Sequence, residues 1–514
     1  MLGQIGSVAL VGLDAHRVRV EAHVAAAMPA FVIVGLPDAA VQESRERVRA
    51  AIANAGYQFP SRRVIVNLAP ADVRKSGPLL DLPIALAFLA ATGQLAPGAA
   101  DLAAVGELGL DGSVRPVTGG LALAEGVRRG GMRGVIVPAA TAAEAALVPD
   151  VDVFPVDSLR EAAAVLADGD GRTAAAVEVS RLLATAPPDD VDFEDVVGQH
   201  TARRAVEIAA AGGHNLLMVG PPGSGKTMLA RRLPTVLPPL TVHEALAVTR
   251  VHGVAGALTA DGPLVCRRPF RAPHHSISTA GLIGGGATPR PGEVSLAHHG
   301  VLFLDELAEF RTAALEALRQ PLEDGRVTVT RALTSVTFPA RVALVGAMNP
   351  CPCGYLGDRD HECTCTPQRL RHYRARLSGP LLDRVDLRVA VGRVPAADLR
   401  SRRPGERSSS VRRRVIAARG RQAGRLCGSD AAANAAMTAR QVRRLCRLTP
   451  SAAAVLDAAY ARLRLSARAC ERIVKVAQTI ADLDEAAAVD ATHVRESLMY
   501  RSLEPSRAQD VGVA

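Results

Sequence analysis

The sequence predicts an α/β protein of about three domains, and three observations support this prediction. Short apolar strands alternate with alanine-rich helices over residues 1–172 and again over 192–395, as in α/β domains with largely parallel sheets. Residues 431–503 have a helical pattern throughout. A chain of 514 residues is also too long to fold around a single hydrophobic core, because domains usually hold roughly 100–200 residues.

The remaining segments separate or follow these regions. Residues 173–191 contain paired prolines and an acidic run, so we expect a linker there. Residues 396–430 are expected to form an arginine-rich connector, and 504–514 a loose tail. Within the first region, VRVEAHV, RRVIVNLAP and GVIVP predict strands. The segment DAAVQESRERVRAAIANAG predicts a helix that ends at Gly56.

Composition limits the location and the partners of the protein. The formal net charge of +10 permits a polyanionic partner, although a solvated basic surface explains it equally well. No secretory leader pattern opens the chain, and the longest apolar run, near 82–92, is too short to span a bilayer. We therefore expect a cytoplasmic protein without a membrane partner, whose thiols stay reduced.

A phosphate-binding loop is the strongest motif. The apolar strand LLMV runs into GPPGSGKT and then into a helical pattern, which fits G-x-x-x-x-G-K-[ST] in its required context. Backbone N–H groups of such a loop surround phosphate oxygens, and the following helix adds its dipole. Lys226 is expected to contact the β- and γ-phosphates of ATP, and Thr227 to hold Mg²⁺. The predicted nucleotide-binding residues of the loop are Gly220, Pro221, Pro222, Gly223, Ser224, Gly225, Lys226 and Thr227.

Two further strands end in polar residues suited to ATP hydrolysis. The strand VLFL is followed by Asp305, which would support Mg²⁺, and by Glu306, which would polarise the attacking water. The strand within RVALVGAMNP ends at Asn349, whose amide would position the water or the γ-phosphate. Paired acids after a strand are common, but the upstream phosphate loop makes them strong candidates for catalysis.

Several longer segments resemble a known ATPase family. VVGQHTARRAVEIAAAGGHNLLMVGPPGSGKT, RPFRAPHHSISTAGLIGGG and GEVSLAHHGVLFLDEL resemble the magnesium-chelatase-like clade of AAA+ ATPases, and together they resemble the YifB/ComM family. The resemblance implies an AAA+ core with a C-terminal helical lid over 431–503. It implies that Gly198 and Gln199 contact the adenine side and that Asn349 is the sensor 1 residue.

The same resemblance assigns roles to two arginines. Arg384 in SGPLLDRVDL matches the arginine finger, and Arg468 in LSARACERIVKVAQTIADL matches the sensor 2 arginine of the lid. A finger acts on the γ-phosphate of a neighbouring subunit, so the resemblance implies a ring, expected to be a homohexamer. The alternative for either arginine is a surface charge or a salt bridge.

Two insertions distinguish the clade from simpler ATPases. One carries His274 and His275, which could bind a metal but in a loop are more often polar surface groups. The other, DGRVTVTRALTSVTFPARVALV, predicts a β-hairpin with Arg331 near its tip. By resemblance both face the central pore, where a basic tip would follow DNA phosphates without reading bases. The arginine-rich connector would add to this contact, or it is a solvated linker.

The N-terminal region carries a second resemblance. KSGPLLDLPIALAFLAATGQL and GELGLDGSVRPVTGGLALAEG resemble the Lon protease domain, which has a ribosomal-S5-like α/β fold. The positions of the Lon serine and lysine are Leu79 and Ala122 here, and neither side chain serves as nucleophile or base. Lys75 and Ser76 lie on the other side of the Gly-Pro pair. We therefore expect a non-peptidase scaffold for subunit or DNA contacts.

Three functions compete on these observations. The first is a DNA motor, by resemblance to ComM a branch-migration helicase acting in recombination or transformation. The second is a chelatase-type motor that remodels a metal-inserting protein, and the third is an ATP-dependent protease. The missing Lon dyad argues against the protease. The Lon-like domain and the absence of a D-x-S-x-S motif argue against the chelatase, so the DNA motor is favoured.

Half of the eight cysteines lie in one short segment, AMNPCPCGYLGDRDHECTCTP, just after Asn349. The spacing is C-x-C, nine residues, then C-x-C, and four thiolates suit a tetrahedral zinc site. C-x-C is tighter than the usual two-residue gap, and a loop of reduced thiols without metal is the alternative. The sequence predicts that zinc at this cluster makes the loop beside Asn349 rigid. The four candidate ligands are Cys351, Cys353, Cys363 and Cys365.

Overall fold

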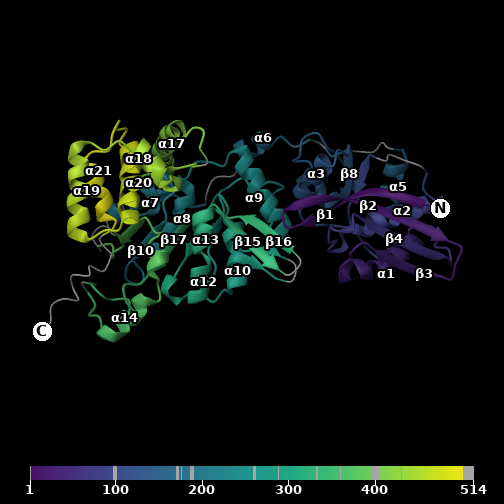
Figure 1. The fold of residues 1–514 in the computed structure, drawn as a ribbon, viewed down its shortest axis with the longest axis horizontal. Helices are drawn as coiled ribbons and strands as arrows, with labels where there is room; N and C mark the ends of the chain where they lie inside the picture. The colour runs from purple at the N-terminus through teal and green to yellow at the C-terminus, as the bar shows by residue number, and fades with distance from the viewer. Residues whose placement is uncertain are drawn as a thin grey trace.

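The computed structural model (Figure 1) places the amino-terminal region at one end, the nucleotide-binding sheet in the middle and a helical region at the other end. The residues that it describes are 2–96, 101–168, 173–174, 176–185, 190–258, 262–286, 289–331, 334–358, 360–395, 400, 405–429 and 431–501. The side chains of Arg331 and Thr334 also lie outside the description. The mixed α/β fold with a helical C-terminal region confirms the predicted fold class.

The amino-terminal region is organised around a mixed sheet. Its described strands have the order β3-β4-β2-β1-β5-β8-β9. Strands β1, β2 and β4 pair antiparallel, whereas β3–β4 and β1–β5–β8–β9 pair parallel. The strands are β1 (Leu2–Val11), β2 (Asp14–Ala25), β3 (Ala30–Val34), β4 (Arg63–Ala69), β5 (Leu102–Ala104), β8 (Gly134–Pro138) and β9 (Asp152–Val156), with a separate hairpin β6 (Glu107–Leu108) and β7 (Val114–Arg115).

Helices cover this sheet and bury a core of alanine, valine and leucine. Helix α2 is apolar around its whole circumference and almost entirely buried, as expected for a helix inside a core. Helix α1 begins at the Asp38 cap, which accepts a hydrogen bond from Val41 N, and it ends just before Gly56, as predicted. The helices are α1 (Ala39–Asn54), η1 (Pro78–Leu80), α2 (Asp81–Ala91), α3 (Gly120–Arg129), α4 (Ala139–Ala145) and α5 (Leu159–Asp168).

The nucleotide-binding region contains a parallel sheet of order β11-β14-β17-β10-β18 within the described residues. Because all of its strands are parallel, their carboxyl ends meet at one edge. The strands are β10 (Leu216–Val219), β11 (Phe270–Arg271), β14 (Val301–Leu304), β17 (Ala343–Met348) and β18 (Leu387–Ala390). The helices are η2 (Phe193–Asp195), α7 (His200–Gly212), α8 (Lys226–Val236), α9 (Val242–Ala255), η3 (Leu307–Glu309), α12 (Thr312–Ala317), α13 (Arg319–Asp324), α14 (Pro367–Ala375) and α15 (Gly379–Leu382).

Two insertions project from this region. The first contains α10 (Thr279–Ile283), a small hairpin of β12 (Gly284–Gly285) and β13 (Arg290–Pro291), and α11 (Glu293–Leu296). The second is the predicted hairpin, β15 (Arg326–Arg331) paired with β16 (Thr334–Pro339). Its apolar side chains are buried in the same cluster as Leu13, from the β1–β2 turn of the amino-terminal region, so this hairpin packs against that turn (Figure 1).

The carboxyl-terminal helices form one group, and two of its members, α17 and α20, pack on α7. The helices of the group are α17 (Ser408–Arg425), η4 (Asn434–Ala436), α18 (Ala439–Leu445), α19 (Pro450–Leu463), α20 (Ala467–Leu483) and α21 (Ala491–Met499). Arg407, Arg412, Arg414, Arg419, Arg421 and Arg425 of the arginine-rich segment bond to carbonyls or acids of this chain. The segment from 408 to 425 is therefore a packed helix and not the solvated connector considered above.

The predicted linker also differs from expectation. Residues 179–184 form α6 (Val179–Ala184), and Leu182 and Leu183 pack against the amino-terminal core. Helix α9 of the nucleotide-binding region packs on α3, and Arg250 on α9 pairs with Glu125 on α3 at 3.2 Å. Apolar burial against neighbouring elements, which the proline and acidic composition does not reveal, explains this difference.

Candidate functional site

The phosphate loop joins β10 to α8 at the carboxyl edge of the sheet. Gly223 and Gly225 adopt positive φ angles of 74° and 90°, which residues with a Cβ rarely accept. Lys226 Nζ lies inside the loop and donates to Gly220 O at 2.7 Å and to Pro221 O at 2.8 Å. Burial lowers the pKa of Lys226, and the charge of Asp305 opposes this shift. The ammonium group therefore lies within the loop, where phosphate oxygens would compete with these carbonyls.

Thr227 and Asp305 form a pair of oxygen ligands beside the loop. Thr227 Oγ1 donates to Asp305 Oδ2 at 2.8 Å, and Glu306 N donates to Asp305 Oδ1 at 2.9 Å. A hydroxyl and a carboxylate are hard oxygen donors of the type that Mg²⁺ prefers, and this ion usually binds through few protein ligands together with substrate phosphates. The residues present therefore fit a magnesium–nucleotide site.

Asn349 and Glu306 lie at the ends of neighbouring strands. Because β17 lies between β10 and β14, Asn349 comes close to the phosphate loop, and its Oδ1 is 3.4 Å from Lys226 Nζ. Glu306 has a positive φ of 51°, and its exposed carboxylate contacts His275, with Nδ1 3.2 Å from Oε2. The sequence interpretation treated His275 as a surface group or a metal ligand and missed this contact. The paired histidines were the one available signal.

Gln199 contacts the phosphate loop at Ser224 and also contacts Gly392, which follows β18. Its Nε2 donates to Ser224 O at 3.2 Å and to Gly392 O at 2.5 Å. Gly198 and Gln199 both have positive φ angles, of 64° and 51°, so the chain turns sharply here before α7. The turn brings the predicted adenine-side residues next to the loop.

Arg384 is held by its own chain, away from the phosphate loop. Nε donates to Arg319 O at 3.0 Å, Nη1 donates to Pro380 O at 2.8 Å, and Nη2 pairs with Glu323. None of these partners belongs to the phosphate loop. Arg384 also lines a cavity of about 280 Å³. The other lining residues are Glu316, Arg319, Gln320, Glu323 and Asp324.

Arg468 lies in the first turn of α20 and is exposed. Among the described residues it has no hydrogen-bond or ion-pair partner, in contrast to Arg472 one turn later. Arg472 Nη1 donates to Asp386 Oδ1 at 2.6 Å. Asp386 precedes β18, so this contact anchors α20 to the nucleotide-binding sheet.

The Asp386 carboxylate is almost fully buried between the sheet and α20. Its Oδ2 is 3.1 Å from His214 Nδ1, and His214 Nε2 is 2.9 Å from Thr479 Oγ1 on α20. Burial alone would raise the pKa of Asp386. The hydrogen bond and charge of His214, with the charges of Arg472 and Lys475, lower it to about 2. Asp386 thus stays ionised and paired.

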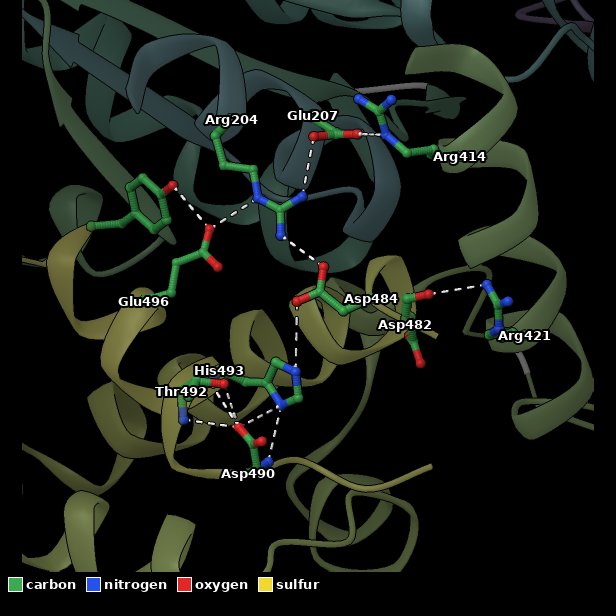
Figure 2. Close-up of polar contacts among 11 residues, drawn as sticks. Arg204, Glu207, Arg414, Arg421, Asp482, Asp484, Asp490, Thr492, His493 and Glu496 are labelled. Carbon is green, nitrogen blue, oxygen red and sulfur yellow. Dashed lines mark hydrogen bonds and ion pairs between the residues drawn. The ribbon is translucent and has the colours of Figure 1, made fainter. Parts of the chain in front are cut away.

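A second group of ion pairs joins α7 to the carboxyl-terminal helices (Figure 2). Arg204 on α7 donates to Glu496 Oε1 at 3.0 Å and to Asp484 Oδ1 at 3.2 Å, and it also contacts Glu207 at 3.2 Å. Arg414 on α17 donates to the other oxygen of Glu207 at 2.6 Å. One network therefore connects α7, α17, α20 and α21.

The four predicted zinc ligands lie together. Their sulfur atoms are all within 4.8 Å of one another, and three of the pairs are 3.3, 3.6 and 3.7 Å apart. Sulfurs about 2.3 Å from a tetrahedral zinc would be about 3.8 Å apart. The same loop contacts the phosphate loop, because a Cβ on Gly354 would lie 2.7 Å from Pro222 Cδ. Tyr373, on the helix α14 that follows the cysteine cluster, donates its OH to Asn349 O at 3.1 Å.

The predicted Lon-like positions lie in the amino-terminal core. Leu79 and Ala122 are both buried. Lys75 is fully buried, and its Nζ bonds to Pro70 O. Arg331 lies at the end of β15, but its side chain is outside the described part of the structure. Its expected contact with DNA therefore stays a prediction.

Comparisons with known proteins agree with this geometry. A profile of "Magnesium chelatase, subunit ChlI" matches residues 192–399, and related ChlI profiles match residues 20–141 and 405–501. YifB of Salmonella typhimurium is 43% identical over 96% of both chains. Competence protein ComM of Haemophilus influenzae is 41% identical over 98% of both.

The chain belongs to the YifB/ComM family of magnesium-chelatase-like AAA+ ATPases. This membership confirms the resemblance drawn from the motifs, and it supports a nucleotide with Mg²⁺ as ligands and ATP hydrolysis as the activity. Lon protease 2 of Bacillus subtilis is 32% identical over 153 residues, covering 28% of this chain and 27% of that protein. No helix in the described part of the chain is both long and apolar enough to cross a membrane.

Proposed function

We propose that this YifB/ComM-family ATPase couples ATP hydrolysis to movement along DNA as a cytoplasmic, ring-forming branch-migration helicase. The observation that carries the ATPase part is the convergence of Lys226, Thr227, Asp305 and Asn349 at one sheet edge. Lys226 would neutralise the β- and γ-phosphates, and Thr227 with Asp305 would hold Mg²⁺. Glu306 would orient and activate the attacking water.

A ring is supported by the position of Arg384. Its partners within the chain are carbonyls and Glu323, and none belongs to the phosphate loop. In an assembly, the γ-phosphate of a neighbouring subunit would compete with Glu323 for the guanidinium group. Arg468 on the lid would complete the site of its own subunit. We propose a homohexamer, as the family resemblance implies.

DNA as the substrate rests on three observations. The net charge is +10, and the β15–β16 hairpin exposes a face of hydroxyl groups, from Thr328, Thr330, Ser335 and Thr337. Hydroxyls and cations bind phosphates without reading bases. The relative named as a competence protein aligns over nearly its whole length, including the amino-terminal region. A chelatase-type motor acting on a protein partner is the alternative.

The experiment that separates these functions uses a branched DNA with a labelled strand. Wild-type protein with ATP and Mg²⁺ should convert the branched substrate to separated products. Lys226→Ala is the control and should give no conversion. Wild-type protein that hydrolyses ATP but leaves all branched substrates intact would contradict the helicase proposal and favour a protein partner.

We further propose that Cys351, Cys353, Cys363 and Cys365 bind one zinc ion per chain. Support comes from the sulfur spacing, which approaches a tetrahedral thiolate site. The ion would hold the loop that contacts Pro222 of the phosphate loop and that directly follows Asn349 in the chain. Zinc would therefore stabilise the geometry of ATP binding and take no part in the reaction.

Elemental analysis of the purified protein tests the zinc proposal. One zinc per chain is expected, and a Cys363→Ser/Cys365→Ser variant should lose both the metal and ATP hydrolysis. Cys427→Ser, at an exposed cysteine outside the cluster, is the matched control and should retain both. A wild-type protein with full activity and no metal would overturn the proposal.

A further inference from the structure

The β15–β16 hairpin depends on neighbouring elements for its position. Among the described strands, β15 and β16 pair only with each other, and a two-stranded hairpin is marginally stable without further packing. One face of the hairpin carries the exposed hydroxyl side chains, and the opposite face is apolar and buried. The buried side chains are Val327, Val329, Val336 and Phe338. The packing of this apolar face therefore determines where the hydroxyl face is presented.

The β1–β2 turn of the amino-terminal region packs against the apolar face of the hairpin. The turn consists of Gly12 and Leu13. Leu13 is only 5% exposed and belongs to the same buried cluster as the apolar face. Gly12 lies so close to the hairpin that a Cβ added to it would overlap Val336 Cγ1. Its φ of 65° also favours glycine. The turn and the hairpin are therefore in direct contact.

This contact lies in the outer half of the hairpin. The pairing runs from Arg326 with Pro339 at the base to Arg331 with Thr334 beside the tip. Val336 pairs with Val329, which is nearer to the tip than to the base. The base is held by its connections to α13 and β17, and the turn holds the outer half. The tip therefore cannot move away from the amino-terminal region without breaking the contact at Val336.

The amino-terminal region is itself fixed to the nucleotide-binding region. Gly253 on α9 lies so close to α4 that a Cβ added to it would overlap Oε1 of the buried Glu144. Val254, the next residue of α9, packs against the cluster that holds Leu13. Three further side chains of the nucleotide-binding region are buried in the amino-terminal core, namely Leu240, Ala245 and Leu264. Such a shared apolar core restrains the two regions from moving independently.

We propose that the β1–β2 turn, through Gly12 and Leu13, is a positioning element for the β15–β16 hairpin. The amino-terminal region thereby holds in place the hairpin that binds DNA phosphates. This inference rests on the proposed DNA-dependent function and gives the Lon-like region, which lacks the protease dyad, a role within that function.

Leu13→Ala tests the inference by two measurements on the full chain. Hydrogen exchange should become faster at the amides of β15 and β16 and stay unchanged in β10 and β14. In steady-state ATP hydrolysis, the concentration of single-stranded DNA that gives half-maximal stimulation should rise by about two- to thirtyfold, as for other residues that act from outside a binding site. The kcat without DNA and the KM for ATP should stay at their wild-type values, because the nucleotide site is untouched.

Two control variants separate positioning from a general loss of stability. Leu13→Met keeps an apolar side chain of similar volume and should restore wild-type exchange and DNA dependence. Leu110→Ala removes a leucine side chain of the same region that is 57% exposed, and it should change neither measurement.

A double-mutant cycle tests the contact itself. Gly12→Ala should raise the half-maximal DNA concentration, because the added Cβ meets Val336. Val336→Ala removes the methyl groups that this Cβ would meet. The strain of the positive φ is common to Gly12→Ala alone and to the combined variant, so it cancels in the cycle. The combined variant should therefore lose less than the product of the two single losses.

Two results would overturn the inference and leave the DNA-dependent ATPase function intact. One is wild-type exchange in β15 and β16 with wild-type DNA dependence in Leu13→Ala, in a protein whose circular dichroism is that of wild type. The other is a cycle in which the two single losses simply multiply. Wild-type protein whose hydrolysis does not respond to DNA would instead overturn the proposed function, and hydrogen exchange would still decide whether the turn positions the hairpin.

Discussion

His298 makes the nucleotide-binding region sensitive to acid. The side chain is only 4% exposed, and its Nδ1 accepts a hydrogen bond from Arg341 N at 3.1 Å, directly before β14 begins. Burial, with the nearby charges of His299, Arg341, Arg250 and His243, lowers the pKa of His298 to about 3. The native protein therefore holds this imidazole neutral.

The sign and size of the effect follow from proton binding. An unfolded histidine has a pKa of about 6.5, so between roughly pH 6.5 and pH 3 the unfolded chain binds a proton that the native chain does not. Stability is then lost as the pH falls, by about 1.4 kcal/mol per pH unit. Acidification from pH 7 to pH 5 should cost about 2 kcal/mol through His298 alone.

The assay is urea unfolding of the full chain at pH 7 and pH 5, comparing wild type with His298→Asn. Asparagine offers an acceptor oxygen near the position of Nδ1 but does not titrate, so the variant should lose about 2 kcal/mol less than wild type on acidification. His274→Asn, at an exposed histidine, is the matched control and should keep the wild-type difference. Equal losses in wild type and His298→Asn would refute the reasoning.

Three further predictions concern the catalytic groups and the amino-terminal region. Glu306→Gln should bind ATP and assemble but not hydrolyse it; ordinary turnover by this variant would remove Glu306 from its proposed role. Lys226→Ala should lose nucleotide binding and Arg384→Ala should lose only hydrolysis, and mixing the two should partly restore activity, because one subunit supplies the finger and the other the loop. Mixed rings no more active than either parent would argue against a finger acting between subunits. Finally, the protein should cleave neither casein nor peptides with or without ATP, and ATP-dependent cleavage abolished by Ser76→Ala would contradict the scaffold role.

The residues predicted at the nucleotide site came from motifs in which chemistry and backbone are coupled. The phosphate loop needs its glycines, the preceding strand and the following helix, so the pattern also predicted β10 and α8. The apolar runs before Asp305 and Asn349 predicted β14 and β17 in the same way. Strand periodicity likewise predicted the β15–β16 hairpin, because its apolar and hydroxyl side chains alternate.

Contacts between segments that are far apart in the sequence could not be predicted from local sequence motifs. The pairing of His275 with Glu306 depends on β11 lying next to β14, and strand order is not encoded in local pattern. The arginines of α17 looked like a solvated run because their partners, among them Glu207 and Asp482, are far away in sequence. Likewise, the local sequence around α6 did not predict that its apolar side chains pack against the amino-terminal core.

The central claim, that ATP hydrolysis is coupled to DNA, is tested most directly by steady-state ATPase rates with no DNA and with single-stranded, duplex and branched DNA. Wild type should hydrolyse ATP faster with DNA, and the stimulation should weaken steeply as salt rises, because phosphate contacts release counterions. Lys226→Ala should be inactive under every condition. A wild-type rate that is the same with and without every DNA, at low salt, would contradict the claim.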